Sequence, residues 1–187
     1  MNVVIFGPPG AWKGTQAQNI VKKFNLYQVS TGDLLRTEIK NKSEIGKEIE
    51  EIISKGDFAT DNIVNKLIKN IIFDPQKKNK LIFDGYPRSL SQAKNLNLLL
   101  DNSNQKINFV FFLNVNKDTI IKRIEKRKIL EKRSDDDLDT ILKRYDTYME
   151  TTRPVLDFYS KNPNFYEIDG GQEISIISSK IEQILAV

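Results

Sequence analysis

Gly7-Pro8-Pro9-Gly10-Ala11-Trp12-Lys13-Gly14-Thr15 is the stretch of sequence that decides the fold. It directly follows a short apolar run, Val3 to Phe6, and it precedes a helical pattern from Gln16 to Phe24. A glycine-rich loop between a strand and a helix turns backbone N–H groups and the positive end of the helix toward a phosphate. The stretch therefore predicts a phosphate-binding loop at the end of the first strand.

The residue types of this loop match what a polyphosphate with magnesium requires. Backbone N–H groups cradle the phosphates, a lysine contacts the β and γ phosphates, and a hydroxyl lies near the metal. A glycine-rich turn that merely joins a strand to a helix is the alternative interpretation, but both the spacing and the flanking elements favour the phosphate loop. The candidate phosphate ligands are Gly10, Ala11, Trp12, Lys13, Gly14 and Thr15.

Trp12 departs from this pattern, because the phosphate-loop motif has glycine immediately before its lysine. Glycine allows close approach of the backbone to phosphate and unusual backbone dihedrals, whereas an indole adds bulk and restricts the backbone. Either the loop holds Trp12 outward and binds nucleotide somewhat differently, or donor binding and turnover are impaired. The sequence leaves both interpretations open.

Short apolar runs rich in β-branched and aromatic residues alternate with longer amphipathic stretches along the chain. This alternation predicts an α/β fold in which helices flank a five-stranded parallel sheet, with ligands gathered beyond the carboxyl ends of the strands. The predicted strands are Val3 to Phe6, Tyr27 to Val29, Leu81 to Phe83, Phe109 to Leu113 and Phe165 to Ile168.

Composition narrows the chemistry that the chain can perform. The 187 residues are 39% hydrophobic and 29% charged, which is typical of one compact globular domain and excludes a disordered chain. The chain has no cysteine and no histidine, so disulfides, thiolate metal sites and a histidine base are excluded. Its formal net charge of +4 comes from lysines scattered along apparent helices, which favours a phosphate-rich small substrate over nucleic acid. No signal peptide or membrane span is visible, so we expect a cytoplasmic protein.

Two further motifs follow the loop in order: Ser30-Thr31-Gly32-Asp33-Leu34-Leu35-Arg36, and Asp84-Gly85-Tyr86-Pro87-Arg88 with Gln92 four residues on. Together with the loop they resemble the adenylate kinase family, and the match covers nearly the whole chain. The resemblance implies reversible phosphoryl transfer from MgATP to AMP, giving two ADP. It also implies the phosphate-loop nucleoside monophosphate kinase fold, with a core of residues 1–29, 60–122 and 138–187, an AMP-binding insert at 30–59 and a short lid at 123–137.

The same resemblance implies an AMP site, and the residue types agree with it. Arg36 and Arg88 are planar, permanently charged forks that suit a phosphate, and the Gln92 carboxamide can donate and accept at the edge of adenine. Ser30 or Thr31 could equally be only a helix cap, and Gln92 could be an exposed polar residue. The implied AMP-binding residues are Thr31, Arg36, Asp57, Phe58, Ala59, Gly85, Tyr86, Pro87, Arg88, Gln92, Arg133 and Arg144.

Asp84 ends an apolar run, where a carboxylate is costly to bury without a partner. The resemblance implies that Asp84 holds waters around the Mg²⁺ of MgATP, with Thr15 as a second candidate metal ligand. A carboxylate that caps the following turn is the alternative interpretation.

Four arginines complete the predicted site. Arg123 and Arg127 share one face of a helix predicted from Asp118 to Lys128, and Arg144 lies on a further helix that opens after a run of acidic residues. The resemblance implies that Arg127 and Arg123 contact ATP, while Arg133 and Arg144 contact the transferring phosphate and AMP. Solvated surface charges are the alternative for each of them. The implied catalytic set is Lys13, Arg88, Arg127, Arg133 and Arg144.

Only Lys128 to Lys132 separates the second arginine from the third, which leaves neither space nor ligands for the zinc found in long-lid relatives. We therefore expect the short-lid form without structural zinc. Gly170 and Gly171 match the family's loop against adenine, and Gln172 is a weaker ATP-binding candidate.

Two other functions remain open from the sequence. A UMP/CMP kinase of the same family is one, although Thr31 and Gln92 favour AMP as the acceptor. A nucleotide-binding protein whose catalysis is impaired by Trp12 is the other. The expected partners are ATP, AMP and ADP, with no nucleic acid and no membrane, and the chain is expected to be a monomer.

Overall fold

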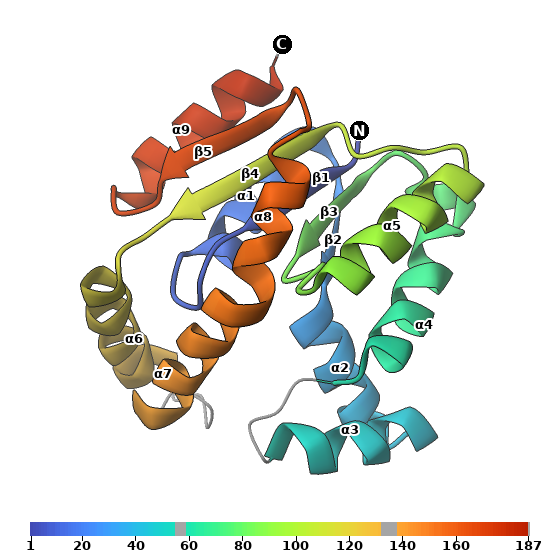
Figure 1. Cartoon of the computed structure of the whole chain (residues 1–187), viewed down its shortest axis with the longest axis horizontal. Coiled ribbons are helices and arrows are strands. Elements are labelled where there is room, and N and C mark those ends of the chain that lie inside the picture. The colour runs from blue at the N-terminus through green and yellow to red at the C-terminus, as the bar shows by residue number, and fades with distance from the viewer. Residues whose placement is uncertain (55–58, 132–137, 187) are drawn as a thin grey trace.

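The computed structural model of the chain describes residues 1–54, 59–131 and 138–186. Within them a single five-stranded sheet has the order β2-β3-β1-β4-β5, and each neighbouring pair is parallel (Figure 1). The predicted α/β fold is confirmed, and four of the five predicted strands are one residue longer at the carboxyl end than expected. The strands are β1 (Val3–Phe6), β2 (Tyr27–Ser30), β3 (Leu81–Asp84), β4 (Phe109–Asn114) and β5 (Phe165–Asp169).

Helices connect the strands and cover both faces of the sheet. They are α1 (Lys13–Phe24), α2 (Thr31–Lys40), α3 (Glu44–Ser54), α4 (Asp61–Ile72), α5 (Leu90–Asn102), α6 (Lys117–Glu131), α7 (Leu138–Thr147), α8 (Arg153–Tyr159) and α9 (Ile174–Leu185). A π-helical turn, Tyr148–Thr152, joins α7 directly to α8, and a short 3₁₀ turn, Pro75–Lys77, precedes β3.

The continuous apolar runs of the strands are explained by burial on both faces. Successive side chains of a strand point to opposite faces of the sheet. Val4 and Phe6 of β1 pack into the core under α4, α5 and α8, whereas Val3 and Ile5 pack into the core under α1 and α9. Parallel strands buried in this way need no polar alternation, which is why the sequence shows none.

Helical segments extend beyond the carboxyl ends of the strands on two sides, α2 and α3 on one and α6 and α7 on the other (Figure 1). The helix that was predicted over Asp118–Lys128 runs from Lys117 to Glu131, so it continues into the predicted lid. The range 30–59 contains α2 and α3. The division into core, insert and lid stays a prediction.

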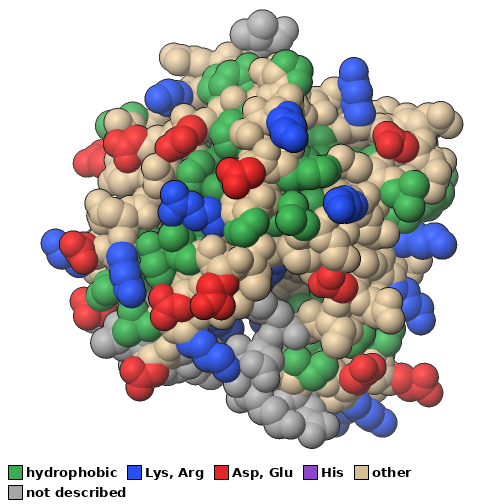
Figure 2. Space-filling model, in the orientation of Figure 1, with side chains coloured by type: hydrophobic (Ala, Val, Ile, Leu, Met, Phe, Trp, Pro, Cys, Tyr) green, Lys and Arg blue, Asp and Glu red, His purple; other side chains and the backbone are tan. Residues whose placement is uncertain are grey.

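Charged side chains of both signs are interspersed over the face shown in Figure 2, with no single basic block on that face. This distribution agrees with the scattered lysines of the sequence. Within the described ranges, no helix has the length and apolarity that a membrane crossing demands.

Candidate active site

The glycine-rich loop lies at the amino end of α1. This helix begins at Lys13, earlier than the predicted Gln16, so Lys13, Gly14 and Thr15 form its first turn. The N–H groups of a first turn have no partner within the helix, and together with the helix dipole they favour an anion. The loop therefore presents the arrangement that a phosphate requires.

Lys13 folds back over the loop. Its Nζ donates hydrogen bonds to the carbonyl oxygens of Gly7, at 2.7 Å, and Pro8, at 2.9 Å. The ammonium group thus lies on the loop itself, beside the amino end of α1, where positive charge adds to that of the helix terminus.

Trp12 occupies a backbone conformation that suits glycine. It caps α1 with φ 63° and ψ 21°, in the left-handed region, and Gly10 has φ 81°. For a residue with a Cβ this region costs roughly 1–2 kcal/mol, and it is especially rare for a bulky side chain. The glycine of the motif is explained by this dihedral requirement, which Trp12 meets in this chain with φ 63°.

Asp84 lies beside the loop at the end of β3. A Cβ built on Gly14 would be 3.5 Å from Asp84 Oδ2, and the same oxygen accepts a hydrogen bond of 3.1 Å from Gln28 Nε2 on β2. Among the described contacts, its hydrogen bond thus comes from a neighbouring strand and not from the following turn. The carboxylate and the Thr15 hydroxyl are oxygen ligands of the kind that Mg²⁺ prefers, and they fit that ion.

The segment after β3 is held by hydrogen bonds to one carbonyl. The Gly85 oxygen accepts from Thr31 Oγ1 at 3.0 Å and from Arg88 Nε at 2.7 Å. Gly85 has φ 74°, and a Cβ there would lie 3.1 Å from Arg88 Nη2, so both the dihedral and the space favour glycine. Thr31 is buried, with 4% of its surface exposed. The two predicted AMP-binding motifs are therefore physically joined.

Positive charge is concentrated around Arg88. Burial lowers the pKa of Arg88 from its ordinary value to about 10; the charge of Asp84 opposes this, while Arg144 and Arg36 lower the pKa further. The guanidinium groups of Arg36 on α2 and Arg144 on α7 are thus each close enough to repel that of Arg88. Such a cluster is stabilised when a phosphate binds among them.

Gln92 is buried, with 5% of its surface exposed, so the interpretation as an exposed polar residue is wrong. Its Oε1 accepts from the Arg88 backbone N–H at 2.7 Å, and its Nε2 donates to Asp61 Oδ1 at 2.6 Å. The carboxamide thus orients the Arg88 segment in this structure. Contact with adenine stays a prediction for this residue.

Ser30 and Thr31 divide the two roles that the sequence left open. Ser30 is the N-cap of α2, where its hydroxyl accepts from the Asp33 N–H at 3.3 Å, whereas the Thr31 hydroxyl points to Gly85. Arg36 is exposed on the same helix and forms an ion pair of 2.5 Å with Asp33.

The side chains of Tyr86, Pro87 and Ala59 are buried. Tyr86 is 1% exposed, its hydroxyl donates to Asn65 Oδ1 at 2.8 Å, and burial raises its pKa to about 12. These three residues stabilise the core beneath the site, so any AMP contact by them would come from their backbones.

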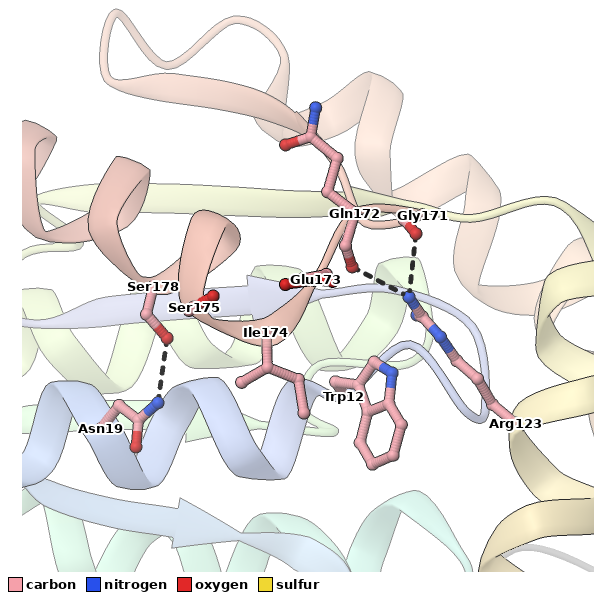
Figure 3. A pocket seen from close by; sticks show the side chains of 9 residues that line it. All are labelled: Trp12, Asn19, Arg123, Gly171, Gln172, Glu173, Ile174, Ser175 and Ser178. Atoms are coloured by element: carbon pink, nitrogen blue, oxygen red, sulfur yellow. Dashed lines mark hydrogen bonds between the residues drawn. The ribbon is translucent and has the colours of Figure 1, made fainter.

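A cleft of about 820 Å³ lies beside the glycine-rich loop, with Trp12 among its lining residues (Figure 3). Arg123 Nη2 donates to the carbonyl oxygens of Gly171, at 3.2 Å, and Gln172, at 3.1 Å. The Gln172 side chain points away from the cleft in Figure 3, so this residue offers only its backbone there. The Arg123 Cζ lies 5.5 Å from the centre of the Trp12 ring.

Several supporting residues had no signal in the sequence. Thr152 Oγ1 donates to the Arg88 carbonyl at 3.0 Å, and Asp61 and Gln28 bind Gln92 and Asp84. Each acts through a partner that is distant in sequence, so no local spacing could reveal it.

Part of the predicted site cannot be placed. Asp57, Phe58 and Arg133 lie outside the described residues. The backbone of Arg127 lies in α6, one turn after Arg123, but its side chain is outside the described part of the chain.

Comparison with known proteins decides the family. The model of the adenylate kinase family, described as "Adenylate kinase", matches residues 5–164. The chain belongs to the adenylate kinase family. It is 48% identical over 213 positions to an adenylate kinase of Pelagibacter ubique, covering all of both chains. It is also 42% identical over 182 positions to that of Azobacteroides pseudotrichonymphae, covering 97% of this chain and 95% of the relative. A third relative, from Mycoplasma capricolum, is 40% identical over 195 positions, covering 90% and 91%.

Membership of this family confirms the resemblance seen in the motifs. The chain is a phosphotransferase that passes a phosphoryl group between ATP and AMP. The UMP/CMP kinase alternative and the inactive binding protein are not favoured.

Proposed function

We propose that this chain transfers the terminal phosphoryl group of MgATP to AMP with two adjoining sites at the carboxyl edge of its sheet. The observation that carries this proposal is the position of Asp84. Its carboxylate lies beside Gly14 in the phosphate loop, and its charge acts on Arg88 in the arginine cluster. A donor on the loop and an acceptor on the cluster would therefore meet at Asp84.

The donor site consists of the loop from Gly10 to Thr15, with Lys13 on the β and γ phosphates. At present the Lys13 ammonium is bonded to the loop carbonyls of Gly7 and Pro8. A polyphosphate offers this cation full negative charges in place of those carbonyl dipoles, so Lys13 would exchange its partners when ATP binds. Arg127 would add charge from α6, since it follows Arg123 by one turn.

The acceptor site consists of Arg36, Arg88 and Arg144, together with Thr31, Gly85 and Gln92. Arginine forks hold a phosphate bidentately and so fix its direction as well as its position. Direction matters because phosphoryl transfer depends on two nucleotides placed in line with water excluded. An AMP phosphate oxygen is already an anionic nucleophile, so the transfer needs no general base. The chain, which has no histidine, therefore lacks no group that this reaction requires.

Asp84 would hold Mg²⁺ through water, with Thr15 as a second oxygen ligand. When bound, this ion neutralises charge on the β and γ phosphates. Among the described residues, no group of three or more His, Cys, Asp or Glu side chains could hold a metal ion.

The short lid without zinc stays a prediction. The alignment with the Pelagibacter relative spans 213 positions against 187 residues here, so residues of the relative have no counterpart in this chain, as a shorter lid requires. We also propose that the ranges 30–59 and 123–137 close over the nucleotides and that their opening limits turnover. A cytoplasmic monomer is the prediction for location and oligomeric state.

The test is ADP formation from ATP and Mg²⁺ with AMP, CMP, UMP and GMP offered separately, for the wild type and Trp12→Gly. We expect turnover with AMP for both proteins, and the ratio of their rates measures how the indole affects the loop. If neither folded protein uses any monophosphate, the proposal fails.

A further inference from the structure

Trp12 combines an unfavourable backbone with a specific position. Its left-handed dihedrals would suit glycine better, and yet the chain has an indole there. A bulky side chain kept in a sparsely populated region at a functional site indicates a role that offsets the conformational cost. The contacts of the indole show what that role is.

The indole is half-buried and forms one wall of the cleft beside the loop. In Figure 3 it stands between the apolar side chain of Ile174 and the guanidinium of Arg123. Arg123 lies over the ring, with Cζ 5.5 Å from its centre, which is within the range of a cation–π contact. One wall of the cleft thus combines an indole with a neighbouring guanidinium.

Arg123 also carries an unused donor. Its Nη2 is bonded to the Gly171 and Gln172 carbonyls, but its Nη1 is buried without a hydrogen-bond partner among the described residues. Burial lowers the pKa of Arg123, with Asp169 opposing this. A buried N–H group without a partner is costly, so an acceptor from a ligand would stabilise this side of the cleft.

These features define the ligand by its chemistry. A flat π surface beside an apolar side chain binds an aromatic ring, and the Nη1 group binds an acceptor on that ring's edge. Trp12 is adjacent in sequence to Lys13, so the ring must belong to a molecule whose phosphates lie on the loop. A nucleoside triphosphate with a purine base meets all of these conditions.

We propose that Trp12 is a stacking residue for the base of the phosphoryl donor, and that it gives this site a preference for purines over pyrimidines. This inference rests on the proposed function, because it assigns a base-binding residue to the donor site. Stacking discriminates weakly between the two purines, because each presents a large π face. ATP and GTP should therefore bind within about ten-fold of each other, while CTP and UTP, with smaller rings, bind more weakly.

The first experiment uses Trp12 itself as the probe. It is the only tryptophan of the 187 residues, so tryptophan emission reports this site alone. ATP and GTP should quench the emission of the wild-type chain, whereas inorganic tripolyphosphate, which occupies the loop without a base, should leave it nearly unchanged. Equal responses to ATP and tripolyphosphate, or no response to ATP at saturation, would overturn the inference.

The second experiment compares Trp12→Phe with Trp12→Leu by calorimetry. Both variants keep a Cβ in the same left-handed backbone, so the conformational cost is common to them, but only phenylalanine keeps a π face. The leucine variant should bind ATP about five-fold more weakly than the phenylalanine variant, or worse, while both bind tripolyphosphate equally. Equal ATP affinities would overturn the inference.

The two proposals fail separately. If ADP forms from ATP and AMP but Trp12 emission does not change when ATP is added, the kinase function stands and the stacking role falls. If ATP quenches the emission through its base and no ADP forms with any monophosphate, the stacking role stands and the kinase function falls.

Discussion

Replacing Arg88 by lysine should make kcat/KM for AMP depend on pH in a range where that of the wild type does not. Burial, together with Arg36 and Arg144, lowers the pKa of Arg88 to about 10, so the guanidinium stays charged throughout the neutral and mildly alkaline range. An equal lowering would take a lysine from its ordinary pKa of about 10.4 to roughly 8. The pKa of the lysine is lowered because burial and neighbouring cations both disfavour a charged ammonium.

The variant should therefore lose the charge that holds the AMP phosphate as pH rises through 8. At pH 9 about nine-tenths of the lysine would be neutral, so kcat/KM for AMP should fall about ten-fold relative to its value in neutral solution. The effect should appear mainly in kcat/KM, because a bound phosphate raises the pKa of a nearby ammonium.

The assay is direct chromatographic measurement of ADP between pH 7.5 and 9.5. This avoids coupling enzymes, and the AMP phosphate keeps a constant charge there because its second pKa is about 6. Arg36→Lys is the matched control, because its side chain is exposed on α2 and an ammonium there stays solvated. A flat profile for Arg88→Lys, or the same decline in both variants, would refute the reasoning.

Three other substitutions test separate parts of the site. Thr152→Val removes the hydroxyl that donates to the Arg88 carbonyl, so it should lower the free energy of unfolding by about 1 kcal/mol and raise KM for AMP but not for ATP. Thr147→Val, whose hydroxyl donates to the Lys143 carbonyl one turn earlier in the helix, is its control, and equal effects of the two in thermal unfolding and kinetics would contradict the role of Thr152. Gly46→Ala would place a Cβ against the Glu38 carbonyl and force α2 and α3 apart, so melting should show a loss of about 1–3 kcal/mol, with KM for AMP raised more than KM for ATP. Asp84→Asn should weaken the response of turnover to Mg²⁺ titration by about 10–100-fold, and an unchanged Mg²⁺ curve would remove Asp84 from the metal site.

The sequence was sufficient for the fold because the deciding signals are local. Each strand is a run of apolar residues that fills both cores, and the loop from Gly7 to Thr15 carries its own turn chemistry. The need for special dihedrals before Lys13 was also visible, since the motif has glycine where Trp12 takes φ 63°. These features depend on neighbours in the chain.

The parts of the site that could not be predicted depend on contacts between residues that are distant in sequence. The contact of Thr152 with Arg88 and that of Gln92 with Asp61 join segments that no periodicity relates. The direction of the Tyr86 side chain, into the core and not toward the site, follows from packing under α4 and α5. No spacing rule conveys such information from a single sequence.

The π-helical turn Tyr148–Thr152 sets the rotational phase between two helices that would otherwise be one. In an α-helix each residue is rotated by about 100° about the axis relative to the one before it. A wider π turn therefore changes the rotation of the side chains of α7 relative to those of α8. Deleting one residue within this turn would restore regular winding and swing Arg144 around the axis of α7, while α8 stayed packed against the sheet. The chain can therefore tolerate a change of residue type in this turn more readily than a change in its length.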